Sequence, residues 1–237
     1  MSSEIVWPFY IVCDVSSSMH RPRKGREQEK TPYDAMLEGL HDLIDFTLDH
    51  VEASDIAHLG VLTFADEAQI SLPLTKMKMR FQIPPLPKGT FTNYAKAFST
   101  TARVVATDVA ALERKGATVR RPTVFFITDG NPEVDGNPQS RAAWGPPLRE
   151  LQAISAVRPG RTPLRIAVVA LGFQGARGKT LVEIAQVPGL ACIATPGVAT
   201  PSELMESLLV AILNSITQSV HDGDLDFVAP NGMEVCT

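Results

Sequence analysis

Oxygen-bearing side chains gather in a short segment of this sequence, directly after an apolar run. Asp14, Ser16 and Ser18 occupy alternate positions, following the mainly aromatic and β-branched residues 9–13. In an extended loop, alternate side chains point the same way, so these three would face a common point. Carboxylates and hydroxyls are hard ligands, of the kind that Mg2+ takes in near-octahedral geometry together with several waters. The segment therefore predicts part of a divalent-cation site.

Two later segments supply further oxygens. In residues 88–93, Thr90 follows Gly89, and Asp129 follows the apolar residues 124–127 and Thr128. Each segment also has an ordinary interpretation. A threonine at position 90 or 92 could simply cap the next helix, and an Asp-Gly pair often forms a turn after a strand.

The three segments together, in this order, resemble the metal-ion-dependent adhesion site (MIDAS) of von Willebrand factor A (VWA) domains. The resemblance implies a metal site formed by Asp14, Ser16, Ser18, Thr90 and Asp129. It implies Mg2+ as the cofactor, with Mn2+ or Ca2+ as alternatives. An open coordination position would attract a Glu or Asp carboxylate from a partner protein. Position in the motif assigns Thr90 to the metal and Thr92 to the helix cap.

The elements that position these loops follow from the hydrophobic periodicity. Parallel strands that are buried on both faces are predicted at residues 9–13, 56–64, 124–128, 164–171 and 190–194. A short antiparallel return is predicted at residues 68–72, where Pro73 suits a sheet edge. Helices are predicted at residues 32–50, 93–115, 148–157, 179–187 and 201–220, the first capped by Thr31. Since ligands bind outside the carboxyl ends of parallel strands, Asp14 and Asp129 should meet there.

The expected fold is therefore α/β. It is a Rossmann-like, doubly wound, mostly parallel six-stranded sheet with one antiparallel edge strand and helices on both faces, as in a VWA domain. The 237 residues suffice for a single core, and we expect one domain over residues 1–220. Residues 221–237 show no periodicity and are expected to form a C-terminal tail.

Composition excludes several classes of function. The net charge of -4 argues against a nucleic-acid partner bound through bulk charge. No apolar run approaches the roughly 20 residues of a membrane span, and residues 1–12 do not resemble a secretory signal. Cysteines 13, 192 and 236 have no metal-binding spacing. A cytoplasmic protein with no membrane partner fits these features best.

Two segments beside the site could contact a partner. Arg21, Arg23, Lys24 and Arg26 form either a partner-binding lip or an ordinary solvated loop. Residues 131–147 are rich in Asn, Pro and Gly and are expected to form a loop over the rim of the site. Within that loop, Trp144 is either an exposed anchor for a partner or a side chain folded onto its own domain.

Enzymatic alternatives match the sequence less well. A phosphatase of the haloacid-dehalogenase type needs a second Asp where Ser16 stands, and no nucleophile elbow surrounds Ser16 or Ser18. Residues 171–180 resemble a P-loop, but Phe173 occupies the position of a required glycine. We expect an interaction module without catalysis. A metal-dependent phosphohydrolase using the same pocket and a scaffold whose metal site is not the interface remain alternatives.

Within the family, the compact single domain resembles most the bacterial TerY-type proteins of tellurium-resistance and stress-response gene clusters. There the domain commonly works as an adaptor beside kinases or phosphatases. The resemblance implies a kinase, a phosphatase or another stress-response protein as the partner.

Overall fold

The computed structural model describes residues 4–21, 30–49, 51–79, 82–157, 162–173 and 175–237, apart from the side chains of 44–49 and 51–52. The predicted lip residues Arg23, Lys24 and Arg26 lie outside the described residues, whereas Arg21 is described and exposed. Among the described residues, no helix combines the length and the apolar character needed to cross a membrane.

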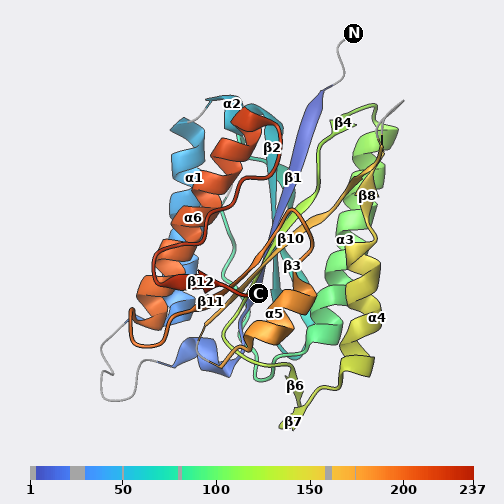
Figure 1. Cartoon of the computed structure of the whole chain (residues 1–237). Helices are drawn as coiled ribbons and strands as arrows, with labels where there is room; N and C mark the ends of the chain where they lie inside the picture. Colours follow the sequence, from blue (N-terminus) through green and yellow to red (C-terminus); the bar gives the residue numbers. More distant parts are fainter. Residues whose placement is uncertain (1–3, 22–29, 50, 80–81, 158–161, 174) are drawn as a thin grey trace.

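A twisted, mainly parallel sheet forms the centre of the molecule (Figure 1). Its strand order is β12-β11-β10-β5-β1-β2-β3. The parallel strands are β1 (Ile5–Asp14), β2 (Ala57–Phe64), β5 (Thr123–Thr128), β10 (Ala167–Gly172) and β11 (Ala191–Ala194). From β1 the chain first builds outward through β2 and then returns to the other side through β5. The strand order therefore reverses between β1 and β5, which is where such sheets bind ligands.

Both edges of the sheet carry antiparallel strands, where we had predicted six strands and one antiparallel edge. The predicted edge is β3 (Ala68–Lys76), which continues past Pro73 because an edge strand tolerates a missing N–H donor. The second edge is β12 (Met233–Val235), paired with β11. Residues 221–237, which we expected to form a C-terminal tail, thus contribute an edge strand to the sheet, and three residues are too few to show a periodicity in the sequence. The two-residue strand β4 (Thr118–Val119) pairs with the start of β1.

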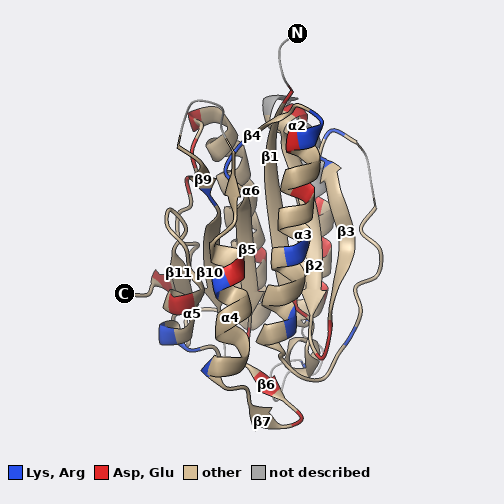
Figure 2. Cartoon of the chain, turned by 90° about the vertical axis from the view of Figure 1, so that its right-hand side faces the viewer, with Lys and Arg blue, Asp and Glu red and all other residues tan. Residues whose placement is uncertain are grey.

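Helices cover both faces of the sheet, which confirms the doubly wound α/β fold. One face carries α1 (Pro32–Asp49), α2 (Val51–Ile56) and α6 (Pro201–Asp222), and the other carries α3 (Tyr94–Arg114), α4 (Arg141–Gln152) and α5 (Gly178–Ile184) (Figures 1 and 2). Two hydrophobic clusters result, one on each face. The remaining short elements are β6 (Glu133–Val134), β7 (Asn137–Pro138), β8 (Ser155–Ala156), β9 (Leu164–Arg165) and the 3-10 turn η1 (Ser17–His20).

The helix starts are fixed by side-chain caps. Thr31 Oγ1 accepts a hydrogen bond from Asp34 N at 3.1 Å, as predicted for α1. At α3, however, the cap is Asn93, whose side chain accepts from Lys96 N at 3.2 Å. The prediction that Thr92 caps this helix was wrong. Thr92 instead pairs with Glu133 through two backbone hydrogen bonds of 3.1 and 2.9 Å, a long-range contact invisible in the local sequence.

Residues 131–147 do not form a single loop, contrary to our prediction. They contain the hairpin of β6 and β7, which projects beyond the lower end of the sheet (Figures 1 and 2). They also contain the first half of α4, which begins at Arg141 rather than at residue 148, despite Pro146 and Pro147. Burial explains this start, because Trp144, Leu148 and Leu151 lie at helical spacing against the core. Trp144 is only 4% exposed, so it packs on its own domain and is not an exposed anchor.

Candidate metal centre

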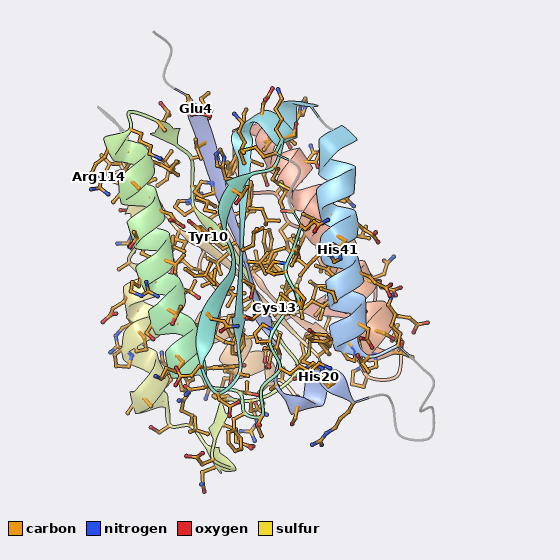
Figure 3. The ribbon with its side chains drawn as sticks, turned by 180° about the vertical axis from the view of Figure 1, so that it is seen from behind. Glu4, Tyr10, Cys13, His20, His41 and Arg114 are labelled. Carbon is orange, nitrogen blue, oxygen red and sulfur yellow. The ribbon has the colours of Figure 1, made fainter. Side chains whose placement is uncertain are left out.

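The first loop of the candidate site begins where β1 ends, at the lower end of the sheet, beyond Cys13 (Figure 3). Asp14 is fully buried, and its Oδ1 accepts a hydrogen bond from Ser16 N at 2.9 Å. The tight turn η1 follows at once, anchored by the buried side chain of Met19. This turn leaves the hydroxyl oxygens of Ser16 and Ser18 3.1 Å apart. The three side chains thus lie close together as predicted, although residues 17–20 form a 3-10 turn and not the extended loop from which we inferred this.

The loop after β5 lies directly against the first loop. Ser18 Oγ donates to Asp129 Oδ1 at 2.8 Å, and Thr128 Oγ1 donates to Asp14 Oδ2 at 2.8 Å. Tyr94, at the start of α3, donates its hydroxyl to the carbonyl of Gly130 at 3.0 Å. Asp14 and Asp129 thus meet between neighbouring strands, as their positions after β1 and β5 predicted.

The Thr90 loop is held to the first loop through its backbone. Gly89 N donates to Val15 O at 3.0 Å, and Ser17 N donates to Thr90 O at 3.3 Å. Gly89 is required by space, because a Cβ there would lie 2.2 Å from Ala65 Cβ. Thr90 itself is exposed at the rim of the site.

The loops of the site are held in place by two residues that were not predicted as ligands. Asp66, in the turn between β2 and β3, accepts from Thr90 N through Oδ2 at 2.6 Å and so fixes the threonine loop. Thr128 links the two carboxylate loops through the hydrogen bond to Asp14. Thr128 was visible within the Thr-Asp-Gly motif, but nothing near Asp66 in sequence signals its contact with a loop 24 residues further on.

A second pair of loops closes the side of the site next to β10. Gly175 N donates to the carbonyl of Asp129 at 2.8 Å, and Asn131 Nδ2 donates to the carbonyl of Gly175 at 2.6 Å. A Cβ on Gly175 would lie 3.3 Å from the Asp129 carbonyl oxygen. The glycine-rich segment that resembles a P-loop thus serves as the turn between β10 and α5 and packs against the Asp129 loop.

The two carboxylates of the site are held in an environment that disfavours their charge. Burial, together with the nearby charge of Asp129, raises the pKa of Asp14 to about 7. Burial also raises the pKa of Asp129 to about 6, against the opposing effects of the Ser18 hydrogen bond and the charge of Arg21. Asp129 Oδ2 is buried and has no hydrogen-bond partner among the described residues. A bound cation would compensate both of these unfavourable features.

The oxygen spacings fit a small octahedral cation. Two ligands bound at right angles to Mg2+, each at about 2.1 Å, lie about 3.0 Å apart. The distances are 3.1 Å from Ser16 Oγ to Ser18 Oγ and 2.8 Å from Ser18 Oγ to Asp129 Oδ1. Within the described part of the chain, no three His, Cys, Asp or Glu side chains group as a metal site. The candidate donors are the hydroxyl and carboxylate oxygens of the predicted site, which are hard ligands with few negative charges.

The rim beside α1 is ordered by ring contacts. The rings of His20 and Tyr33 lie 4.2 Å apart, and Lys88 Nζ lies 5.2 Å from the centre of the Tyr33 ring. Tyr33 also donates its hydroxyl to the carbonyl of Leu86 at 2.7 Å. Burial, with the charge of Lys88, lowers the pKa of His20. The protonated form of His20, which Figure 3 labels, is therefore disfavoured on this side of the site.

The doubly wound α/β fold, with hydroxyl and carboxylate loops where the strand order reverses, is the arrangement expected of a VWA domain. A comparison with protein families gives the same class. The sequence profile of the von Willebrand factor type A domain matches residues 9–131, just over half of the chain. The chain therefore belongs to the VWA family. No curated protein sequence matches it at a significant level.

Solved structures show the same fold at low sequence identity. A von Willebrand factor type A protein from Catenulispora acidiphila is 15% identical, with a TM-score of 0.60, over 91% of this chain and 43% of that one. The pilus adhesin SpaC from Lactobacillus rhamnosus GG, in its open conformation, is 14% identical, with a TM-score of 0.62, over 93% and 31%. Proximal thread matrix protein 1 from the mussel byssus, with a zinc-occupied MIDAS motif, is 18% identical, with a TM-score of 0.54, over 90% and 48%. This chain spans less than half of each of these structures.

Proposed function

We propose that this protein is a Mg2+-dependent protein-interaction module without catalysis, which binds an acidic residue of a partner through a MIDAS. Asp14, Ser16, Ser18, Thr90 and Asp129 would hold the cation, with Mn2+ or Ca2+ as alternatives to Mg2+. The bound cation supplies an electrophilic coordination position that a Glu or Asp carboxylate can fill. Thr128, Asp66 and Gly89 position the ligands and need not touch the metal.

The observation that carries this proposal is the group of oxygens on Ser16, Ser18 and Asp129. Their hydrogen-bonded separations of 3.1 and 2.8 Å are also those of neighbouring ligands on one octahedral cation, and Asp129 Oδ2 lacks a hydrogen-bond partner among the described residues, which supports the proposal. An ordinary Asp-Gly turn would be solvated and would not bury a second carboxylate against the first.

The cellular role is proposed from the family resemblance alone. We infer an adaptor or scaffold in the cytoplasm, in a bacterial tellurium-resistance or stress-response system of the TerY type. Its partner would be a kinase, a phosphatase or another stress-response protein. Membership of the VWA family supports an interaction module in general, and a pilus adhesin is among the solved structures of the same fold.

The proposal is tested by metal binding and partner capture with one set of variants. Mn2+ binding, followed by electron paramagnetic resonance, should be lost in Asp14→Ala and retained in Asp135→Ala, whose residue is exposed on the β6–β7 hairpin. Affinity capture from lysate should yield specific proteins only with Mg2+ and only with an intact Asp14. Circular dichroism must show that Asp14→Ala is folded.

Two results would contradict the proposal. Capture of the same proteins in Mg2+, in EDTA and by Asp14→Ala would mean that the metal site is not the interface. Turnover of a phosphoester that Asp129→Ala abolishes would assign the same pocket to a hydrolase.

A further inference from the structure

A groove lies along α6, the helix on the flank of the molecule opposite α3 and α4 (Figure 1). It encloses about 750 Å³ between α6 and the segment 226–231, which leads back toward β12. A second hollow of about 320 Å³ lies between α6 and α1 and shares Glu206 and Val210 with the first. We call the joined surface the α6 groove, and its lining includes Glu38, Asp42, Glu206, Val210, Asp226 and Val228.

Apolar side chains in this groove are exposed to solvent. Val210 is 56% exposed and Val228 is 73% exposed, although each stands next to other apolar lining residues. The lining between the two helices also includes the side chains of Leu209 and Leu213, which are buried. Such a grouped apolar surface within a groove is typical of a binding site, whereas single exposed valines are not.

The charges around this apolar surface are nearly all negative. The acidic lining residues are Glu38, Asp42, Glu206 and Asp226, and the only cation in the described lining is Lys30. Lys30 is already paired with two of the acids, at 2.5 Å from Glu38 and 2.8 Å from Glu206. Asp42 and Asp226 are exposed. A partner with basic residues would complement this lining, and an acidic one would be repelled.

The walls of the groove favour a helical ligand over a strand. The wall residues on α1 and α6 belong to helices, whose backbone groups are already hydrogen-bonded and offer no edge for strand addition, and the remaining wall is the irregular segment 226–231. A groove with an apolar floor and charged margins is the usual receptor for an amphipathic helix, which inserts one apolar stripe.

We propose that the α6 groove binds a basic amphipathic helix of a partner protein. Leucine-sized side chains of that helix would contact Val210 and Val228, while its Lys or Arg residues would face Asp42 and Asp226. The lining contains none of Asp14, Ser16, Ser18, Thr90 or Asp129. The groove is therefore a second interaction surface, and its binding does not depend on the metal. An adaptor with both surfaces could hold two partners at once.

The probe for this proposal is a synthetic, fluorescein-labelled peptide of about 18 residues, long enough to form a helix. It carries Leu on one face and Lys on the flanks, and a companion peptide carries Glu in place of Lys. Fluorescence anisotropy is measured in EDTA, so that the metal site cannot contribute. We expect the Lys peptide to bind and to weaken as salt increases, and the Glu peptide not to bind.

Matched variants locate the binding. Val210→Arg should weaken binding of the Lys peptide at least tenfold, because it places a cation on the apolar surface that the Leu face of the peptide would cover and repels the Lys residues of the peptide. Val157→Arg is the control, since Val157 is 59% exposed and lies outside the groove lining. Asp42→Asn combined with Asp226→Asn should reduce the affinity several-fold without altering the fold, since both side chains are exposed. This double variant keeps the test informative if Val210→Arg fails to fold.

Three outcomes would overturn the proposal. Equal affinity for the Lys and Glu peptides would show that charge does not contribute to the binding. Equal affinity in wild type, in Val210→Arg and in the double variant would place the binding elsewhere. A wild-type dimer in size-exclusion chromatography that Val210→Arg dissociates would assign the groove to a second copy of this chain. Because the assay contains EDTA, none of these results depends on whether the metal site functions as proposed.

Discussion

Replacing Asp129 with Asn should stabilise the metal-free protein and remove its response to Mg2+. Asp129 is 2% exposed, and its Oδ2 has no hydrogen-bond partner among the described residues. Burial raises its pKa to about 6 in the folded chain, against about 3.9 in an unfolded one. A difference of about two units corresponds to about 3 kcal/mol between the charged and neutral forms. The charge of Asp129 therefore opposes folding.

The pH dependence gives the sign of the effect. Because the folded pKa lies above the unfolded one, the destabilisation is full above about pH 6 and fades as the pH falls from 6 toward 4. Asn is neutral throughout and can still accept the hydrogen bond of Ser18. Its amide nitrogen would stand where Oδ2 lies and would bury an N–H donor without an acceptor. This cost would offset about 1–2 kcal/mol of the gain. We expect a net gain of about 1–2 kcal/mol near pH 8 and no gain near pH 4.5.

Urea unfolding followed by circular dichroism measures this difference, in EDTA and again with excess Mg2+. Wild type should gain about 2.7 kcal/mol at a Mg2+ concentration of about 100 times its Kd, whereas Asp129→Asn should gain nothing. Asp135→Asn, on the exposed hairpin, is the control and should leave both results unchanged. If Asp129→Asn is less stable than wild type in EDTA near pH 8, the buried charge does not destabilise the fold and the reasoning is refuted.

Two further variants test the packing around the site. Gly89→Ala should lower both the melting temperature and the affinity for Mn2+, because its Cβ would lie 2.2 Å from Ala65 Cβ and 2.8 Å from Asp66 Oδ2. Overpacking of this kind typically costs about 1–3 kcal/mol of stability. An unchanged Mn2+ affinity would mean that the Thr90 loop does not hold the metal. Trp144→Ala should reduce stability in urea by about 3–5 kcal/mol and leave the Mn2+ affinity unchanged. The Trp144 ring centre lies 4.2 Å from Arg141 Cζ and 6.1 Å from the centre of the Phe98 ring, so its loss would leave a cavity in the core. A loss below about 1 kcal/mol would contradict the role of Trp144 in the core.

The parts of the fold that the sequence predicted are those encoded locally. β1 and β5 are continuous apolar runs that end at a carboxylate or next to one, so both the strand and the position of its loop could be inferred. The oxygens of Ser16, Ser18 and Asp129 converge because parallel strands end at the same edge. The metal-ligand roles of these residues, and of Asp14 and Thr90, stay predictions until metal binding is measured.

Our errors arose where distant contacts outweigh local preference. Asn93 and Thr92 are both good capping residues, and the backbone pairing of Thr92 with Glu133 leaves the cap to Asn93. Prolines 146 and 147 indicated a loop, yet burial of Trp144 extends α4 through them. β12 has three residues and exists only because β11 offers it an edge. None of these contacts leaves a pattern in a short window of sequence.

The two proposed surfaces differ in how far apart in the sequence their residues lie. This difference determines whether a sequence alone can suggest each surface. The metal centre consists of motifs at strand ends, so a single sequence suffices to suggest it. The α6 groove joins residues far apart in the chain, as when Lys30 pairs with both Glu38 and Glu206, and no motif encodes it. A chelator then separates the two surfaces experimentally. A partner lost in EDTA belongs to the metal centre, and a partner that stays in EDTA but is lost in Val210→Arg belongs to the groove.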